Sequence, residues 1–393
     1  MLNITKEHKR LSWQKGKHMI LLSEKEVKHF DDFASAENFL KKQKEMDQWI
    51  RVPINQLIVK PLPRNPVFLK TIMEEQEITS SEESTLSAME DTNLLLSYPD
   101  ESGKRNVIPL RTTSISSLKE RAKLNGASLQ KMPCEKTAFT LNCGLELWDE
   151  QSLLLVRDEK ISAVHSGDEK DYSILCMQDL LKVLKDELDE KFFGYTTNGI
   201  EVDHEMLIAS FYLPDKMLED LNEILVKKQR KPLKGKPMLK FASSDVGICG
   251  ANLYPYIEND RVCIRIGESL RLKHKNKASL EDFKENCGKI YSIFKGMEGI
   301  EKLLSLKIKH PYDCFLAVAK KCALPKKAVL EAAEDFDAFR PVECYAYDIY
   351  MGLWDVTKYV KTENESQLIS LEENISRALA LDYSSFDYKF SWM

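Results

Sequence analysis

The chain has 393 residues, of which 43% are hydrophobic and 30% are charged, and its formal net charge is −5. This length and balance predict two or three domains with well-formed cores, and they argue against a protein that coats nucleic acid by bulk positive charge. The nine cysteines include no Cys-x-x-Cys pair, which argues against a disulfide framework and a zinc ribbon. No apolar run approaches the roughly 20 residues of a membrane span, and the first residues lack the apolar core of a signal peptide. We therefore expect a cytoplasmic protein with reduced thiols and no membrane partner.

Composition divides the chain into four regions. Residues 1–73 are expected to form a small mixed unit, with a helix at 36–46 and a strand between 49 and 62. Residues 74–105 begin with an acidic stretch rich in Ser and Thr, which we interpret as a linker or surface loop. An α+β core over 106–297 and a helical region with an aromatic tail over 298–393 complete the chain.

The pattern strand, strand, helix occurs three times between residues 150 and 297. The strand pairs are expected at 153–157 with 161–165, at 192–196 with 206–212 around an Asn198-Gly199 turn, and at 237–256 with 261–270. The helices are expected to begin at Ser173, at Pro214 and at the capping box formed by Ser279 and Asp282. These units favour an α+β fold, in which an antiparallel sheet carries helices on one face and a helical region follows.

The first hairpin gives a specific expectation about burial. Its apolar strand residues should be buried, and the charged residues between the strands should be exposed at a turn. The residues expected to be buried are Leu153, Leu155, Ile161 and Val164, and those expected to be exposed are Asp158 and Lys160.

Residues 118–132 and 315–329 share a second pattern, in which a small residue falls four positions after an alanine and an apolar residue ten positions after it. This spacing is typical of two short helices that cross at a tight turn. In the first copy the helix after the turn ends before Pro133 and is too short to lie along a major groove. We therefore expect this unit to pack structurally, with Ala122 against Gly126.

Local motifs predict no catalytic residue, metal ligand or cofactor. The histidines show no metal-ligand spacing, and the glycines around Cys249 lack the third glycine of a dinucleotide-binding loop. The arrangement closest to a catalytic cluster is Asp203-His204-Glu205, which a polar turn explains equally well. We therefore lean against an enzyme.

A basic run at residues 227–240 contains no acidic residue. It is either a solvated loop or a segment that contacts phosphates, and cations on the following hairpin could widen the same surface. The candidate nucleic-acid-binding residues are Lys227, Lys228, Arg230, Lys231, Lys234, Lys236, Arg265, Arg271 and Lys273.

Several segments between about residues 106 and 360 resemble a family of phage/plasmid-like proteins of unknown function. The similar segments are 109–133, 156–166, 345–359 and Ala242-Ser-Ser-Asp-Val-Gly247, the last of which is similar to a Ser-Glu-x-Gly strand of that family. A Cys-x-Asn-Gly segment of many members is missing, and residues 261–266 occupy its place. The resemblance implies a protein of a mobile element but supplies no activity.

The leading hypothesis is an accessory protein of a mobile element, without enzymatic turnover, that binds nucleic acid or a nucleic-acid-processing protein. One alternative is a protein-interaction factor, such as an inhibitor of a host defence complex whose acidic segment at 74–91 imitates phosphate charge. A second alternative is an enzyme whose site is assembled from residues that are distant in sequence.

Overall fold

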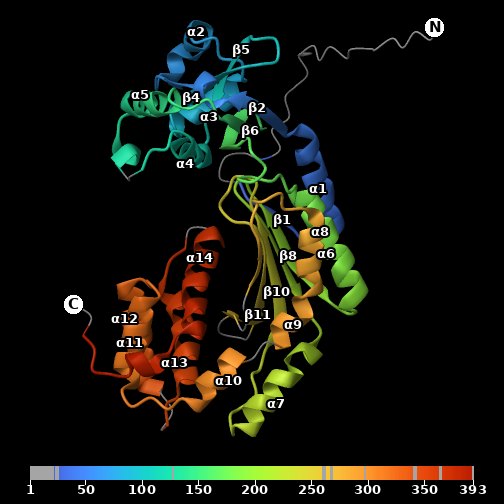
Figure 1. Ribbon diagram of the computed structural model, residues 1–393, viewed down its shortest axis with the longest axis vertical. Helices are drawn as coiled ribbons and strands as arrows, with labels where there is room; N and C mark the ends of the chain where they lie inside the picture. Colours follow the sequence, from blue (N-terminus) through green and yellow to red (C-terminus); the bar gives the residue numbers. More distant parts are fainter. Residues whose placement is uncertain are drawn as a thin grey trace, which may run out of the picture. The chain divides into compact units, whose positions relative to one another are not determined.

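The computed structural model describes residues 22, 26–125, 128–258, 263–265, 269–295, 298–339, 343–362 and 365–391. The described chain forms two compact units, one containing Met46–His165 and the other containing Val27–Glu45 together with the residues from Ser166 onward (Figure 1). The expected boundaries after residues 73 and 105 both fall inside the first unit, and the expected boundary after residue 297 falls inside the second. The division into units therefore differs from the one that composition suggests.

The first unit contains two three-stranded antiparallel sheets. One sheet has the order β2 (Gln48–Pro53), β6 (Gln151–Arg157), β7 (Lys160–Ser166), and the other has the order β3 (Ile58–Pro61), β4 (Leu94–Pro99), β5 (Arg105–Pro109). A parallel bridge between Leu110 and Ile161 joins them. The helices of this unit are α2 (Leu69–Glu75), α3 (Glu82–Glu90), α4 (Thr112–Arg121) and α5 (Cys134–Leu145), with short 3-10 turns at Ile54–Gln56, Pro66–Phe68 and Ser128–Lys131.

Strand β4 is buried on both of its faces. Leu94 and Leu96 belong to the main core of the first unit, whereas Leu95 packs in a smaller core with residues of α2 and α3. Side chains alternate between the faces of a strand, so an uninterrupted apolar run is what a doubly covered strand requires. The strand thus separates two hydrophobic layers.

The acidic segment is not a linker. Residues 82–90 form α3, and the Ser81 side chain accepts a hydrogen bond from the Ser84 backbone N–H as the N-terminal cap. Glu82 and Glu83 lie in the first turn, where negative charge favours a helix. The buried side of α3 consists mainly of small residues such as Ser84 and Ala88, so the sequence shows no stripe of large apolar residues.

Helix α5 packs closely against the end of α4 at a glycine. A Cβ atom added to Gly144 would lie 2.6 Å from the Ala122 carbonyl oxygen and 2.8 Å from the Ala122 Cβ. The expected partner of Ala122 was Gly126, which lies outside the described residues. The segment after it forms only the 3-10 turn Ser128–Lys131, in keeping with a structural unit.

The second unit is built on an antiparallel seven-stranded sheet, which confirms the α+β class. The strand order is β1 (Lys28–Phe30), β8 (Thr196–Val202), β9 (Leu207–Tyr212), β10 (Lys236–Ser243), β11 (Ala251–Glu258), β12 (Cys263–Arg265), and β13 (Leu270–Leu272) also pairs with β11. Before residue 296, the helices of this unit are α1 (Phe33–Met46), α6 (Met177–Lys191), α7 (Glu219–Lys227), α8 (Leu280–Gly288) and α9 (Ile290–Lys295). A 3-10 turn lies at Asp215–Leu218.

The C-terminal region is helical, as expected from the sequence. Its helices are α10 (Glu298–Ser305), α11 (Pro311–Lys321), α12 (Lys326–Phe339), α13 (Ala346–Leu353) and α14 (Glu365–Ser376), with 3-10 turns at Trp354–Tyr359, Arg377–Ala380 and Tyr383–Phe386. The second helix-turn pattern thus forms the pair α11 and α12. In the aromatic tail, Tyr383 is fully buried, and its turn packs against α11.

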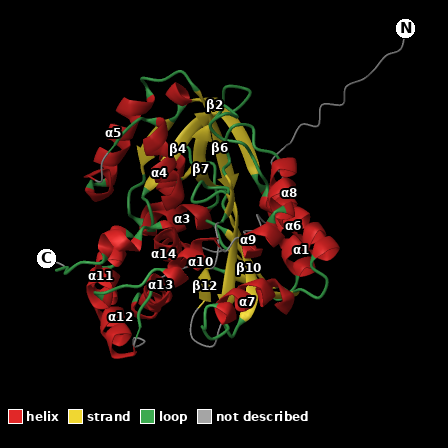
Figure 2. Ribbon diagram, turned by 60° about the horizontal axis from the view of Figure 1, so that its bottom comes forward, coloured by secondary structure: helices red, strands yellow, loops and turns green. Residues whose placement is uncertain are grey.

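Helices cover both faces of the large sheet (Figures 1 and 2). Phe241 and Leu253 face a core shared with α6 and α8, whereas Tyr254 and Tyr256 pack on the other face with Ile369 of α14. The prediction of helices on one face was therefore incomplete. The C-terminal helix α14 supplies the second layer.

Two of the expected strand–strand–helix units share this sheet, and the first does not. Its hairpin, β6 and β7, belongs to the first unit, while the helix that follows belongs to the second. Helix α6 begins after Cys176 rather than at Ser173, whereas the capping box of Ser279 and Asp282 is confirmed at α8. The class was predicted correctly, and the assignment of one hairpin was wrong. The single strand expected at 237–256 is also wrong, because this segment forms β10 and β11, which pair with each other.

The expected Asn198-Gly199 turn is also wrong, because both residues lie within β8. Gly199 has a φ of 119°, and the pairing with β9 shifts register between Thr197 and Ile200. The chain reverses instead after Val202, where the Asp203 carboxylate accepts the backbone N–H groups of Glu205 and Met206 at 2.7 Å each. An aspartate that binds backbone groups two and three residues ahead stabilises a turn without glycine.

Candidate functional site

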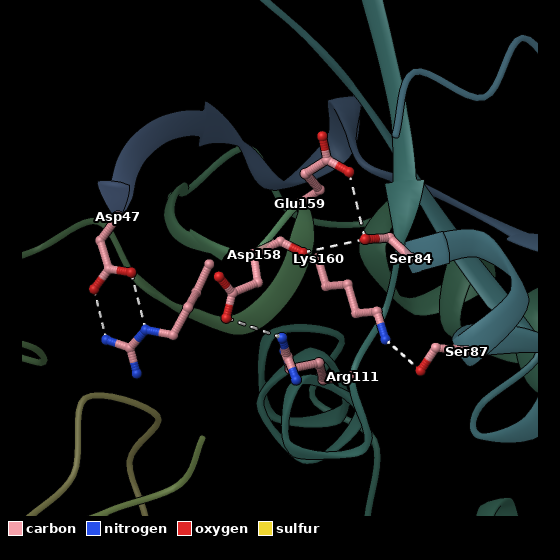
Figure 3. A network of polar contacts seen from close by, with 8 residues as sticks. Asp47, Ser84, Ser87, Arg111, Asp158, Glu159 and Lys160 are labelled. Atoms are coloured by element: carbon pink, nitrogen blue, oxygen red, sulfur yellow. Dashed lines mark hydrogen bonds and ion pairs between the residues drawn. The ribbon is translucent and has the colours of Figure 1, made fainter. Parts of the chain in front are cut away.

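Four consecutive charged residues, 157–160, span the end of β6, the turn and the start of β7, and the structure holds all four in polar contacts (Figure 3). The Arg157 guanidinium donates to both carboxylate oxygens of Asp47, at 2.9 and 2.6 Å, and the two side chains are 2% and 7% exposed. The Asp158 carboxylate lies 3.8 Å from the Arg111 guanidinium, and both side chains are nearly inaccessible. The expected exposure of Asp158 was wrong.

The other two residues of this turn contact α3 and the residue that caps it. The Glu159 carboxylate accepts the backbone N–H of Ser81 at 2.9 Å and the hydroxyl of Ser84 at 3.4 Å. The Lys160 ammonium donates to the hydroxyl of Ser87 at 2.8 Å, and Lys160 is buried, contrary to expectation (Figure 3). The turn therefore anchors the acidic helix to the hairpin.

Local sequence shows why this network was missed. Four charged residues between two apolar strands resemble a solvated turn, and their partners Asp47 and Arg111 are distant in sequence. Asp158 and Glu159 both adopt positive φ, of 50° and 57°, which is the geometry of a tight hairpin turn. The buried strand residues Leu153, Leu155, Ile161 and Val164 match the expectation.

The predicted nucleic-acid-binding residues differ in exposure and in their partners. Arg230, in the connection from α7 to β10, donates from both terminal nitrogens to the Asp348 carboxylate at 3.1 and 2.9 Å. Its guanidinium also lies 4.7 Å from the centre of the Tyr345 ring. Asp348 is the third residue of α13 and accepts the backbone N–H of Tyr345. Arg230 therefore ties the connection to the start of α13, and a phosphate contact would have to displace this pair.

The lysines of the same connection are exposed. Lys227 pairs with Glu223 at 3.6 Å, with both side chains mostly in solvent, and the Lys228 ammonium lies 3.4 Å from the Ser305 hydroxyl. Lys231, Lys234 and Lys236 are exposed as well, and the Lys236 ammonium lies 4.9 Å from the centre of the Tyr212 ring.

The backbone of this connection is held in place at Leu233. The Asn222 side chain accepts the backbone N–H of Leu233 at 2.8 Å and donates to its carbonyl at 3.4 Å. Gly235 passes so close to β11 that an added Cβ would lie 2.4 Å from the Glu258 carbonyl oxygen. The exposed lysines therefore project from a fixed segment.

The cations of the following hairpin differ from one another in their surroundings. Lys273 is exposed, and Arg271 pairs with Glu373 of α14 at 3.2 Å. Arg265 is only 1% exposed, so it cannot widen a surface that receives a nucleic-acid strand. The assignment of Arg265 to that surface was wrong.

Arg265 belongs to a polar layer between the sheet and α14 that sequence reading missed. The Tyr256 hydroxyl donates to the Glu372 carboxylate at 2.6 Å, and the Tyr254 hydroxyl donates to Glu373 at 3.3 Å. The side-chain amide of Asn252 donates to the Tyr254 hydroxyl at 2.9 Å. Burial raises the pKa values of both tyrosines, so their hydroxyl groups stay protonated.

Polar residues also gather at one end of the sheet, in the turns before β9 and after β10 and β13. The Tyr172 hydroxyl donates to the Asp245 carbonyl at 2.9 Å, and its ring stacks on His274 with the centres 5.5 Å apart. Burial lowers the pKa of His274 to about 4, although its contact with the Ser173 carbonyl acts in the opposite direction. In the Asp203-His204-Glu205 turn, burial and the neighbouring Asp203 raise the pKa of Glu205.

Among the residues that the structure describes, no group of three or more His, Cys, Asp or Glu side chains is arranged to hold a metal ion. Within the same residues, no helix has the length and apolar character that crossing a membrane requires. Comparison of the chain with protein-family models, with curated proteins and with solved structures finds no match. The resemblance to phage/plasmid-like proteins therefore stays a hypothesis that rests on short motifs.

Proposed function

We propose that this protein binds a nucleic-acid strand through the exposed lysines of the α7–β10 connection, as a non-enzymatic accessory protein of a mobile genetic element. The observation that carries the proposal is the exposure of Lys228, Lys231, Lys234 and Lys236 on a segment without acidic residues whose backbone is fixed. A fixed segment presents its cations without a large loss of conformational entropy on binding. The short motifs shared with phage/plasmid-like proteins support the mobile-element origin.

The structure reduces the number of cations that are available for phosphates. Arg230 is bound to Asp348 and Arg265 is buried. Lys227 and Arg271 pair with carboxylates of Glu223 and Glu373. We therefore take the other four lysines of the connection, Lys228, Lys231, Lys234 and Lys236, as the contacting group. Each phosphate that is neutralised on a single strand contributes about 0.7 to the dependence of log K on log salt concentration. We therefore expect a salt slope of about 3 for a single strand.

The decisive experiment is a fluorescence-anisotropy titration of the full chain with single- and double-stranded DNA and RNA at low salt. The test variant carries Lys228→Glu, Lys231→Glu and Lys234→Glu. The control variant carries Lys41→Glu, Lys42→Glu and Lys182→Glu, which make the same change in net charge at exposed positions of α1 and α6. We expect the test variant to lose binding and the control variant to retain most of it.

Two outcomes would contradict the proposal. If the wild-type chain binds none of the four nucleic acids at low salt, the lysine segment has another role. If both variants lose affinity equally, the binding reflects bulk charge rather than this segment. Unchanged far-ultraviolet circular dichroism of both variants shows that the fold is intact, since exposed charges contribute little to stability.

A second candidate function is recognition of a basic protein by the acidic face of the first unit. The acidic residues around α2 and α3 are exposed, which favours this alternative. They are Glu74, Glu75, Glu77, Glu82, Glu83, Glu90 and Asp91. Such a surface attracts cationic partners at long range. It becomes the leading proposal if the titration shows no binding of nucleic acid.

A further inference from the structure

Arg265 is a buried arginine without an anionic partner in the described chain. Three described arginines are less than 5% exposed, and two of them lie within 4 Å of a carboxylate, as Arg111 does with Asp158 and Arg157 with Asp47. Arg265 is 1% exposed, and its Nε and Nη1 atoms have no hydrogen-bond partner there. These atoms are N–H donors of a charged, planar guanidinium.

The position of Arg265 is set by strand pairing. Arg265 on β12 is the cross-strand partner of Tyr256 on β11, so both side chains lie on the face of the sheet that α14 covers. The guanidinium carbon lies 4.4 Å from the centre of the Tyr254 ring, and the Tyr350 hydroxyl donates to the Arg265 carbonyl at 2.7 Å. The guanidinium is therefore held on an aromatic ring, and its backbone is fixed from α13.

Two carboxylates of α14 on this face are engaged by other groups. Glu372 accepts the Tyr256 hydroxyl, and Glu373 accepts the Tyr254 hydroxyl and pairs with Arg271. A buried charge without a partner is strongly disfavoured, because water is removed and nothing replaces it. A guanidinium has two edges that can each bind two oxygens of one oxyanion, and Nε and Nη1 lie on different edges.

We propose that Arg265 anchors a binding site for one small oxyanion, a carboxylate or phosphate group, on the face of the sheet under α14. The ring of Tyr254 supports the flat side of the guanidinium, and one of its two donor edges receives the anion. Glu372 and Glu373 already bring negative charge to this face, so a singly charged anion fits better than a polyphosphate. Because Arg265 is buried, the anion enters when α14 moves away from the sheet, and it holds α14 in place once bound.

The test uses the full chain in a buffer that contains chloride as its only small anion. Inorganic phosphate, acetate and a nucleoside monophosphate are added separately, with sodium chloride at matched ionic strength as the reference. Thermal unfolding and amide hydrogen exchange of residues 365–376 are measured. We expect a saturable rise of the melting temperature and slower exchange in α14 with at least one oxyanion, and no comparable effect of chloride.

Variants locate the binding. Arg265→Met retains much of the side-chain volume and removes the charge, and it should abolish the response to the oxyanion. Arg265→Lys keeps the charge but loses the planar fork, and its apparent affinity should fall on the order of tenfold. Arg271→Met is the matched control, since Arg271 lies on the same face but is half exposed and paired with Glu373, and it should respond like wild type.

Three results would overturn the proposal. The first is an equal response to chloride and to every oxyanion in wild type. The second is a full response of Arg265→Met, which would place the binding elsewhere. The third is a response without any change of exchange in α14. If the two Arg265 variants do not fold, amide exchange of α14 in the wild-type chain, measured with and without the oxyanion, decides whether the anion binds under α14. A response to the nucleoside monophosphate but not to free phosphate would identify the oxyanion as part of a larger ligand. Since the site is separate from the lysine segment, loss of nucleic-acid binding in the triple-lysine variant leaves this response unchanged.

Discussion

Arg157 and Asp47 form a buried ion pair in which two guanidinium nitrogens bind the two oxygens of one carboxylate. The residues are 110 positions apart in sequence, and the pair joins the end of β6 to the residue that precedes β2. Its two parallel hydrogen bonds give it a defined geometry, and its burial makes each charge depend on the other. Loss of one partner therefore has a predictable consequence.

We expect Asp47→Ala to lower the free energy of unfolding by about 3–5 kcal/mol, because the Arg157 charge stays buried without its carboxylate. Urea denaturation followed by circular dichroism measures the loss. Glu150→Gln is the control, since the Glu150 pair with Lys123 is about half exposed and should contribute less than about 1 kcal/mol. Equal effects of the two substitutions would show that burial does not strengthen the Asp47 pair.

Gly144→Ala should destabilise the first unit by about 1–3 kcal/mol, although alanine is the better helix former. The new Cβ would meet the backbone oxygen of Ala122 at 2.6 Å, and backbone atoms cannot move aside as the end of a side chain can. Gly288→Ala in α8 is the control, because the nearest atom to its added Cβ is the Lys191 ammonium at 3.8 Å. It should stabilise the chain by up to about 1 kcal/mol. Thermal unfolding of both variants shows the sign of each change in stability. If both substitutions stabilise the chain, the close approach of Gly144 to Ala122 is contradicted.

His274 should make stability depend on pH between about 4 and 6.5. Burial lowers its folded pKa from 6.5 to about 4, so the folded imidazole is neutral where the unfolded one takes up a proton. The contribution is complete above pH 6.5 and is lost as the pH falls toward 4, with a total of up to about 3 kcal/mol. His274→Asn keeps a donor near the Ser173 carbonyl but does not titrate. The difference between the two stability profiles isolates His274, and parallel profiles across this pH range would refute the assignment.

Substitution of Arg230 should lower stability, whereas substitution of Lys231 should weaken nucleic-acid binding. Arg230→Met removes a partly buried pair with Asp348, so the free energy of unfolding should fall by about 1–2 kcal/mol while affinity for a single strand changes little. Lys231→Met removes an exposed cation and should weaken binding without a loss of stability. Urea denaturation and anisotropy on the same preparations measure both quantities. A large loss of affinity in Arg230→Met would restore Arg230 to the binding surface.

Helices whose caps and apolar stripes lie within a few neighbouring residues were predictable from the sequence. The capping box at α8 needs only Ser279 and Asp282, three positions apart, and the structure has both of its hydrogen bonds. The apolar stripe of α6 was also recognised, with Met177 and Leu184 among its buried residues. Its start was placed at Ser173, because serine is a common cap and nothing in the local sequence shows that the Ser173 backbone N–H binds the His274 carbonyl.

The candidate site was predictable only in part, because some of its residues have partners that are distant in sequence. The basic run was visible as composition, and five of its six lysines are exposed as a phosphate-contacting segment requires. Arg230 is unavailable for phosphates because it binds Asp348, which lies 118 positions away. Arg265 is unavailable because it is buried on the face of the sheet that α14 covers. A charged residue looks the same in sequence whether it meets solvent or a distant partner.

The α+β class and the helical C-terminal region follow from local sequence, because hydrophobic periodicity and caps act within one or two turns of chain. Which strands share a sheet depends on the tertiary structure, since β6 pairs with β2 and β7 pairs with β6, and neither joins the strands that follow them. The tertiary structure also decided that the charged turn at 157–160 is held in polar contacts. Burial of a charge depends on polar partners that only the folded chain brings within about 4 Å, and Asp47, Arg111 and Ser87 are such partners here.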